Sequence, residues 1–315
     1  MKSKICLFLI IFISTFTNAQ EIKFSEVELD IPTNSITING TLLTSTLQEK
    51  TPLVILIPGS GPTDRNGNSA MAKNNSLKFL AEVLAGENIA TYRFDKSVLS
   101  YSKDDKKKID SLTFEVFIEE AQSVVDFFIN SYNYSKIIIA GHSQGSLVGM
   151  IAAKNKADGF ISLEGAGRSI DEILIEQIGL QAPFLKDETK SILAELKQGN
   201  TVDEFNPMLI SLFNKQVQPF LISWIKYNPQ FEISKLKVPI LIINGSKDIQ
   251  TKNLDAELLH NTAINSQLEI IENMNHIFKE IKGDLTENMQ SYNNPKLPVM
   301  KELANRITNF VKDLK

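Results

Sequence analysis

A serine with a glycine two residues away on either side is the strongest chemical signal in the sequence. Residues 141–145 read Gly-His-Ser-Gln-Gly, directly after the apolar segment Lys136–Ala140 and directly before a helical pattern that opens at Gly145. A nucleophile at a sharp strand-to-helix turn needs small neighbours, because the backbone is crowded there, and the helix N-terminus points free N–H groups at a developing anion. A structural glycine turn is the alternative, but this setting predicts Ser143 as a catalytic nucleophile.

A serine hydroxyl needs a general base, and the sequence contains three histidines. His142 lies inside the turn itself, where we expect a packed or capping role. His260 lies in a polar helix end that is typical of a surface residue. His276 follows the last predicted strand, on a loop at the carboxyl end of the sheet, where α/β sheets place functional groups. His276 is therefore the predicted base.

The acid that orients the base should lie between the nucleophile and the base in the chain, at another strand end. The apolar strand Pro239–Ile243 leads into Asn-Gly-Ser-Lys-Asp, which places Asp248 just beyond it. Asp255, on the following helix, and Glu272, at a strand end, are weaker rivals. Asp248 is the predicted acid.

Two backbone N–H groups are needed to stabilise the oxyanion of an acyl-transfer reaction. One is the N–H of Gln144, immediately after the nucleophile. The other should come from the glycine-containing loop after the strand Leu53–Ile57, where residues 58–65 read Pro-Gly-Ser-Gly-Pro-Thr-Asp-Arg and Ser60 is the best donor by position. Each such donor contributes roughly 10²–10³ to turnover.

Short, continuously apolar segments separated by helical patterns position these residues, as in a buried parallel sheet. Two amphipathic strands, around Lys23–Ile31 and Ser35–Ser45, come first, with a turn at residues 32–34. Six further strands are predicted at Leu53–Ile57, Ile89–Phe94, Lys136–Ala140, Gly159–Leu163, Pro239–Ile243 and Leu268–Ile271. Alternation of strands and helices requires right-handed crossovers, so we expect eight strands in an α/β sheet with helices on both faces.

One segment, residues 167–236, breaks this alternation because it is helical in pattern and has no strand candidate. An insertion between two strands over a sheet edge favours a lid, and extra packing without a role at the site is the alternative. Phe220 and Trp224 share a helical face and are predicted to bind substrate by roofing the acyl pocket above Ser143. In the alternative, that face packs against the body of the protein.

The amino terminus is typical of an export signal. A basic start precedes the apolar run Ile5–Ile13, and small residues follow at 17–19, so we expect a signal peptide at 1–19 and a mature protein at 20–315. The apolar run is too short to span a bilayer. The expected location is periplasmic or extracellular, without membrane attachment after signal removal. Cys6, the single cysteine, would leave with the signal, which excludes a disulfide or cysteine metal site in the mature chain.

A net charge of −4 gives no indication of nucleic-acid binding. No cofactor or metal is implied by the motifs, and the sequence leaves the oligomeric state open. Arg65, Arg93 and Asp95 fall on adjacent strand-end loops. We interpret them as a structural ion pair, with contact between Arg65 and a substrate carboxylate as the lesser alternative.

The chain resembles bacterial α/β-hydrolases of the carboxylesterase and serine aminopeptidase-like group. The resemblance rests on residues 58–65, Tyr-Arg-Phe-Asp-Lys at 92–96, the nucleophile turn, Gly245-x-x-Asp248 and Met-Asn-His at 274–276. The order of serine, aspartate and histidine along the chain is also the α/β-hydrolase order. The resemblance implies an α/β-hydrolase fold, an eight-stranded mostly parallel sheet with helices on both faces and an inserted helical lid, and serine hydrolase activity.

Fold and triad do not fix the substrate, so several functions stay open. An esterase for small or carbohydrate-linked acyl esters is the leading interpretation. A peptidase would need an acidic anchor for the substrate amine, for which the insertion offers Asp171, Glu172, Asp187 and Glu188. A CoA thioesterase would be separated from CoA by export, and a haloalkane dehalogenase would need a carboxylate at position 143. A catalytically inactive binding protein is the alternative from another class.

Overall fold

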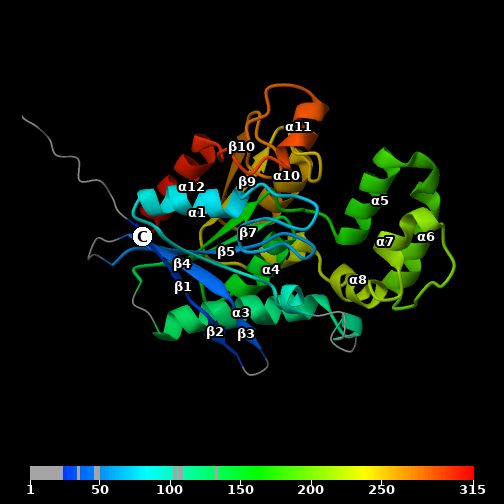
Figure 1. The fold of residues 1–315 in the computed structure, drawn as a ribbon, viewed down its shortest axis with the longest axis horizontal. Coiled ribbons are helices and arrows are strands. Elements are labelled where there is room, and N and C mark those ends of the chain that lie inside the picture. Colours follow the sequence, from blue (N-terminus) through cyan, green and yellow to red (C-terminus); the bar gives the residue numbers. More distant parts are fainter. Residues whose placement is uncertain (1–23, 34–35, 46–49, 102–104, 106–108, 132–133) are drawn as a thin grey trace, which may run out of the picture.

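The computed structural model describes residues 24–33, 36–45, 50–101, 105, 109–131 and 134–315. The predicted signal peptide at 1–19 lies outside these residues. The described strands of the main sheet number eight, in the spatial order β1-β4-β6-β5-β7-β8-β9-β10 (Figure 1). Their bounds are β1 Phe24–Glu28, β4 Gly40–Ser45, β5 Leu53–Ile57, β6 Ala90–Phe94, β7 Ile137–His142, β8 Gly159–Leu163, β9 Ile240–Gly245 and β10 Ser266–Ile271.

The sheet is mostly parallel, as the apolar patterning predicts. The strands from β6 to β10 in the spatial order pair in parallel, while β1 pairs antiparallel with β4, and β4 pairs antiparallel with β6. Parallel strands place their carboxyl ends at one edge, so the loops after β5, β7, β8, β9 and β10 meet there. These are the loops that carry the predicted site residues.

The opening pair is a hairpin whose tip is a separate small ribbon. The ribbon consists of β2 (Ile31–Pro32) and β3 (Thr37–Ile38), so the predicted strand Ser35–Ser45 is divided in two before Gly40. The side chain of Tyr92 crosses the hairpin at this point: its hydroxyl donates to Leu29 O at 2.9 Å, and a Cβ on Gly40 would lie 2.0 Å from that hydroxyl. Glycine is therefore required where the second strand resumes.

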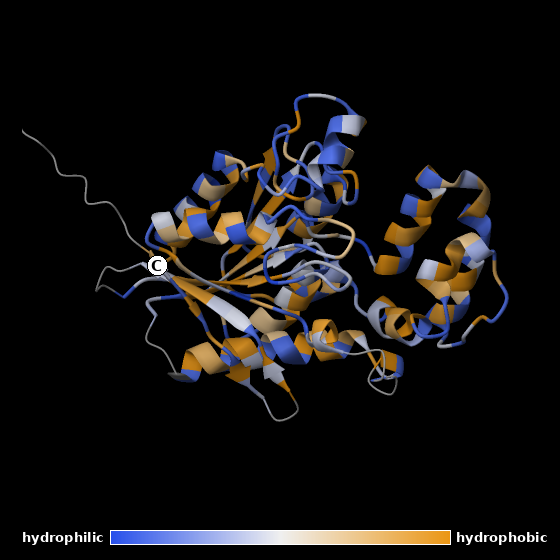
Figure 2. Ribbon diagram, in the orientation of Figure 1, coloured by the Kyte–Doolittle hydropathy of each residue, from blue (hydrophilic) through white to orange (hydrophobic). Residues whose placement is uncertain are grey.

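Helices cover both faces because successive side chains of a strand point to opposite sides. In β5, Leu53, Ile55 and Ile57 pack in one apolar cluster, and Val54 and Leu56 pack in another. The first cluster is covered by α3 (Phe114–Ser131), α4 (Gln144–Ala153) and α10 (Asn253–Thr262), and the second by α1 (Ser76–Gly86) and α12 (Lys301–Asp313). The central strands are mostly apolar in Figure 2, as expected for a sheet buried on both faces, whereas the edge strand β1 carries polar residues and is exposed.

Two further elements lie in connecting segments. A short 3-10 helix, η1 (Ser97–Ser100), follows β6, and α11 (Leu285–Ser291) lies between the loop after β10 and α12. The sequence pattern did not indicate α11. Its N-cap Asp284 accepts hydrogen bonds from the N–H groups of Thr286 and Glu287.

The insertion at residues 167–236 consists of helices and connecting loops without a strand among the described residues, and it lies to one side of the sheet in Figure 1. It has its own apolar core, which includes Leu193, Leu196, Phe213 and Leu221. Its helices are α5 (Ile170–Gln181), η2 (Pro183–Leu185), α6 (Lys186–Lys197), η3 (Pro207–Leu209), α7 (Ile210–Phe213), α8 (Gln218–Ile225) and α9 (Pro229–Ile233). We call this segment the helical insertion.

The helical insertion is attached to the sheet domain by two kinds of contact. At its start, Arg168 donates to both carboxylate oxygens of Asp255 on α10, at 2.9 and 2.8 Å. At α8, the ring of Trp224 stacks on Phe114 of α3 with centroids 5.5 Å apart. None of the described helices is long and apolar enough to cross a bilayer.

Candidate active site

Ser143 lies at the turn between β7 and α4, in a backbone conformation that few residues other than glycine adopt. Its φ is 53°. The turn is crowded, since a Cβ on Gly141 would lie 2.1 Å from the carbonyl oxygen of Gly145, and a Cβ on Gly145 would lie 2.5 Å from that of Ile57. The two glycines therefore allow the strand and helix to meet closely enough to hold Ser143 in this strained conformation.

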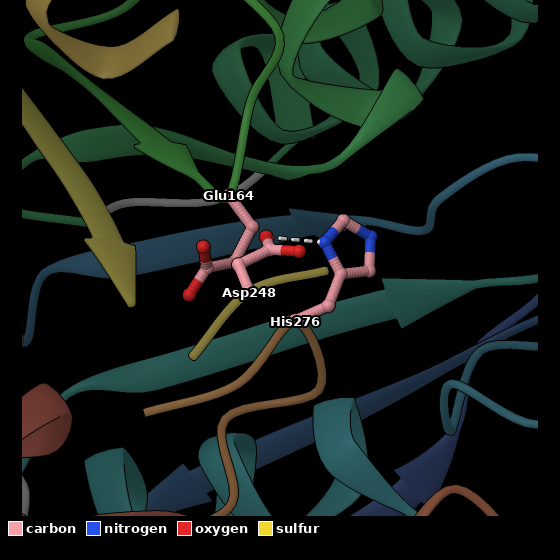
Figure 3. Close-up of side chains that lie close together, drawn as sticks. All are labelled: Glu164, Asp248 and His276. Atoms are coloured by element: carbon pink, nitrogen blue, oxygen red, sulfur yellow. Dashed lines mark hydrogen bonds and ion pairs between the residues drawn. The ribbon is translucent and has the colours of Figure 1, made fainter. Parts of the chain in front are cut away.

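His276 and Asp248 are joined by a short hydrogen bond (Figure 3). The distance from His276 Nδ1 to Asp248 Oδ2 is 2.6 Å, and the Asp248 side chain is fully buried. An ionised carboxylate only accepts, so Nδ1 carries the proton and Nε2 of the neutral ring is left to take one. This is the tautomer that a general base requires.

The Asp248 carboxylate is held by three further hydrogen bonds from its own loop. Oδ1 accepts from Gln250 N at 2.6 Å and Thr251 N at 3.1 Å, and Oδ2 accepts from Thr251 Oγ1 at 2.7 Å. Burial alone would raise the pKa of Asp248, but the charge and hydrogen bond of His276, together with hydrogen bonds from Glu164 and Gln250 N, outweigh burial and lower the pKa to about 2. Asp248 is therefore ionised at neutral pH.

Glu164 is a third buried side chain at this site that sequence reasoning missed (Figure 3). It follows β8 directly, has a φ of 49°, and accepts from Gly245 N at 3.0 Å. Burial, and after it the negative charge of Asp248, raise the pKa of Glu164 well above its ordinary value. A signal was present in the sequence, because Glu164 occupies the end of one central strand just as Asp248 follows the end of the next.

Glu164, Asp248 and His276 present oxygen and nitrogen atoms within 4.8 Å of one another, the one such group of possible metal ligands in the described ranges. Ligand atoms around zinc lie about 2.0–2.3 Å from the ion, and hence more than 3 Å from each other. The 2.6 Å contact between His276 and Asp248 is too short for such a pair. The arrangement fits a shared proton better than a shared metal ion.

His142 is packed against the base, in agreement with the role predicted for it. Its Nε2 lies 2.8 Å from the carbonyl oxygen of His276, and the two rings have centroids 4.8 Å apart. Burial, followed by repulsion from His276, lowers the pKa of His142 to about 3, so its ring is neutral and Nε2 is the donor. The residue next to Ser143 thus supports the loop that carries His276.

The backbone N–H groups of Ser60 and Gln144 have no hydrogen-bond acceptor among the described residues. Gln144 is the first residue of α4, and Ser60 lies in the loop after β5. The loop approaches the nucleophile closely, because a Cβ on Gly59 would lie 3.3 Å from the Cβ of Ser143. Two donors are thus available beside Ser143.

A cavity of about 600 Å³ lies between the sheet domain and the helical insertion, and Ser143, Ser60 and Gln144 are part of its wall. Phe220 and Trp224 line it too, from α8. Most of the wall is apolar; it includes Leu112, Phe117, Leu147, Ile170, Ile173, Leu174, Leu212, Val217 and Leu221. The described wall contains no Asp or Glu side chain.

Phe220 and Trp224 combine the two arrangements considered for them. Both pack on α3 of the sheet domain, with Phe220 5.6 Å from the Phe117 ring and Trp224 on Phe114. Both also face the cavity. Leu221 and Ile225 belong to the core of the helical insertion, and Leu221 also lines the cavity, because α8 is packed on both sides.

Arg65 lies in a network of ion pairs away from the cavity. It donates to Asp95 through Nε at 3.0 Å and Nη2 at 2.8 Å, and to Glu28 through Nη1 at 2.5 Å. Arg93 pairs with Glu26 at 2.5 Å. The structural interpretation of these residues is confirmed, and the alternative contact of Arg65 with substrate is not supported because Arg65 does not line the cavity.

The comparisons with known proteins agree with the observed fold. The chain is 26% identical over 271 residues to Esterase EstD of Thermotoga maritima; the match covers 80% of this chain and 61% of that protein. It superposes on Est1E from Butyrivibrio proteoclasticus with a TM-score of 0.58 at 17% identity, over 91% of this chain and 99% of the other. This chain has the α/β-hydrolase fold.

An acylaminoacyl peptidase from Pyrococcus horikoshii has the same fold, with a TM-score of 0.54 at 17% identity over 85% of this chain and 40% of the peptidase. No family model matches the sequence. The α/β-hydrolase fold expected from the sequence motifs is therefore confirmed, and esterases and a peptidase both share it.

Proposed function

We propose that this protein is a serine carboxylesterase that cleaves small or carbohydrate-linked acyl esters through an acyl-enzyme on Ser143. The observation that carries the proposal is the position of Ser143, at a strained turn in the wall of an apolar cavity and beside two N–H groups that have no acceptor in the part of the chain that the structure describes. Apolar walls exclude water and strengthen the hydrogen bonds made to a developing oxyanion.

In the proposed reaction, Ser143 Oγ attacks the acyl carbon of the ester while its proton passes to His276 Nε2. The carbonyl oxygen becomes an oxyanion that accepts from Ser60 N–H and Gln144 N–H. Collapse of this intermediate breaks the bond to the alcohol, which leaves with the proton from His276. Water, deprotonated by His276, then attacks the acyl-enzyme, and Ser143 leaves with the proton from His276. Asp248 stabilises the imidazolium during both acylation and deacylation.

The cavity wall favours an ester over a peptide with a free amino terminus. A substrate ammonium group would need an acidic partner, and none lines the described cavity. Three of the four candidate anchors have other contacts: Asp171 binds Lys197 at 2.8 Å, Glu172 accepts from Ser169, and Glu188 accepts from Asn206 N. The amide side chains of Gln177, Asn214 and Gln216 could instead bind hydroxyls of a carbohydrate alcohol.

Hydrolysis of a panel of p-nitrophenyl acyl esters, set against a panel of aminoacyl anilides, tests this proposal. We expect turnover of the esters, and labelling of Ser143 by a fluorophosphonate probe located by peptide mass spectrometry. Faster turnover of the anilides would show that the protein is a peptidase and not an esterase. If the probe does not label Ser143, the proposal of a serine hydrolase is wrong and the alternative of an inactive binding protein is favoured.

We also propose that residues 1–19 direct export and that the working enzyme begins at residue 20. The support is the sequence of a basic start, an apolar run and small residues. Expression of the whole chain in a bacterium, followed by fractionation and amino-terminal sequencing, tests this. Recovery of the uncleaved chain in the cytoplasm would contradict it.

A further inference from the structure

The loop after β5 is held at both ends by two consecutive residues that follow β6. At the end of the loop, the Asp95 carboxylate accepts from Arg65 N at 2.7 Å as well as from the Arg65 guanidinium. At its beginning, Lys96 Nζ donates to the carbonyl oxygen of Gly59 at 2.6 Å. Residues 59–65 are therefore clamped onto the end of the neighbouring strand. We call this segment the oxyanion loop.

Lys96 is an unusual residue for a purely structural contact. Its side chain is 3% exposed, and Nζ lies 4.9 Å from the centre of the Phe117 ring. Burial lowers the pKa of Lys96 to about 7, and the charge of buried Glu120 opposes this shift. Burying an ammonium group is costly unless it is well paired. An apolar side chain would fill the same space without that cost, so the contact with Gly59 O needs another explanation.

The explanation lies in the geometry of the peptide that Lys96 binds. In a planar trans peptide the carbonyl of one residue and the N–H of the next point in opposite directions. Because Gly59 O points at Lys96, the N–H of Ser60 points away from Lys96, and Ser60 lies in the cavity wall together with Ser143. A hydrogen bond donated to the carbonyl also polarises the peptide, which makes its N–H a better donor.

We propose that Lys96 is a positioning residue of the oxyanion hole, which orients and polarises the Gly59–Ser60 peptide so that Ser60 N–H meets the oxyanion. This inference rests on the proposed function, because it requires an oxyanion to form at Ser143. Lys96 does not touch the substrate; it does not line the cavity. It acts through the peptide that does.

The test compares two buried lysines. Lys96→Met removes the charge and the donor at the oxyanion loop. Lys279→Met is the matched control, because Lys279 Nζ also donates to a carbonyl, that of Leu297 at 2.6 Å, and also lies over a ring, that of Phe79 at 4.8 Å. For wild type and both variants, kcat and KM are measured with a p-nitrophenyl ester. A trifluoromethyl ketone is then added, and ionisation of its hemiketal on Ser143 is followed by ¹⁹F NMR.

We expect Lys96→Met to lower kcat by about 10- to 100-fold with KM nearly unchanged, a smaller loss than that of deleting a donor outright. The hemiketal should ionise ~10-fold less readily in Lys96→Met, because the oxyanion is less well stabilised. Lys279→Met should lower the melting temperature while leaving hemiketal ionisation as in wild type. If Lys96→Met does not fold, Lys96→Gln is measured by the same criteria.

The proposed esterase function and the proposed role of Lys96 can be contradicted separately. If wild type forms no hemiketal on Ser143, the proposed function is wrong. If wild type forms the hemiketal, and Lys96→Met ionises it as readily as wild type does, the positioning role of Lys96 is overturned while the esterase stands. Equal loss of hemiketal ionisation in Lys279→Met would also overturn it, because the effect would then follow from removal of any buried lysine.

Discussion

The carboxyl end of the sheet and the helical insertion line the same cavity, but they hold their residues by different forces. At the sheet, Asp248 accepts four hydrogen bonds, and Ser143 is fixed by the strained turn after β7. In the insertion, Phe220 and Trp224 are placed by apolar contacts with rings on α3. Hydrogen bonds are directional and fix atoms, whereas apolar packing fixes volume and tolerates change.

Because of this difference, we expect substitutions at the strand ends to affect the rate, and substitutions in the insertion to affect substrate selectivity. Changes at the strand ends should slow the reaction of every substrate, because they act on atoms that every reaction uses. Changes in the insertion should alter which acyl chains react while leaving the reactive serine intact. Substitutions in the two regions test this difference.

The largest effect is expected for Ser143→Ala. Loss of the nucleophile should lower kcat by about 10⁶ for short and long esters alike, with the fold retained by circular dichroism. Ser211→Ala, another serine of the cavity wall, is the control and should keep most of the activity. If Ser143→Ala retained a tenth of the wild-type rate, Ser143 would not be the nucleophile.

Asp248→Asn should follow, with a loss of roughly 10³–10⁴ in kcat that is again independent of chain length. The neutral amide cannot stabilise the imidazolium. If its NH₂ group took the place of Oδ2, it would point a donor at the donors Thr251 Oγ1 and His276 Nδ1. Steady-state kinetics with short and long esters measure this. A loss confined to one chain length would show that Asp248 shapes the pocket instead of orienting the base.

Trp224→Ala and Phe220→Ala should shift the ratio of kcat/KM between long and short acyl chains by about 10-fold. Labelling of Ser143 by a small phosphonate should be unchanged, because the strand ends are not altered. Phe184→Ala is the control, since Phe184 is an aromatic residue of the insertion that is 71% exposed and does not line the cavity. An unaltered chain preference in folded Trp224 and Phe220 variants would place the acyl pocket elsewhere.

The smallest effect should come from Glu164→Gln, and it should be visible in stability. Because the pKa of Glu164 is raised by burial, its contribution to stability is fully present below the unfolded-state pKa of about 4.3 and is lost as pH rises toward the folded-state pKa. Glutamine does not titrate. The melting temperature of Glu164→Gln minus that of wild type should therefore increase from pH 5 to pH 8.

Thermal unfolding at several pH values measures this difference. A difference that stayed constant or decreased from pH 5 to pH 8 would mean that Glu164 is ionised in the folded protein. Two adjacent strands would then end in two charged carboxylates, in place of one neutral and one charged.

Local sequence determined much of this protein. Apolar segments predicted the six strands from residue 53 onward, because a strand buried on both faces has to be apolar, and amphipathic patterns predicted the opening pair. The position of Ser143 followed from its two glycines, and the pairing of His276 with Asp248 followed from their places after parallel strands. Their carboxyl ends meet at one edge, so residues far apart in the chain become neighbours by topology alone.

Other features were decided only by tertiary structure. The sequence places Glu164 at a strand end and Lys96 in the segment 92–96, but it does not show their roles, because each role depends on burial and on one partner from a distant segment. That partner is Gly245 for Glu164 and Gly59 for Lys96. The pattern of α8 also could not separate Ile225, in the core of the insertion, from Trp224 at the cavity. Helical periodicity marks which side chains are apolar, but the elements packed around a helix decide what each of them contacts.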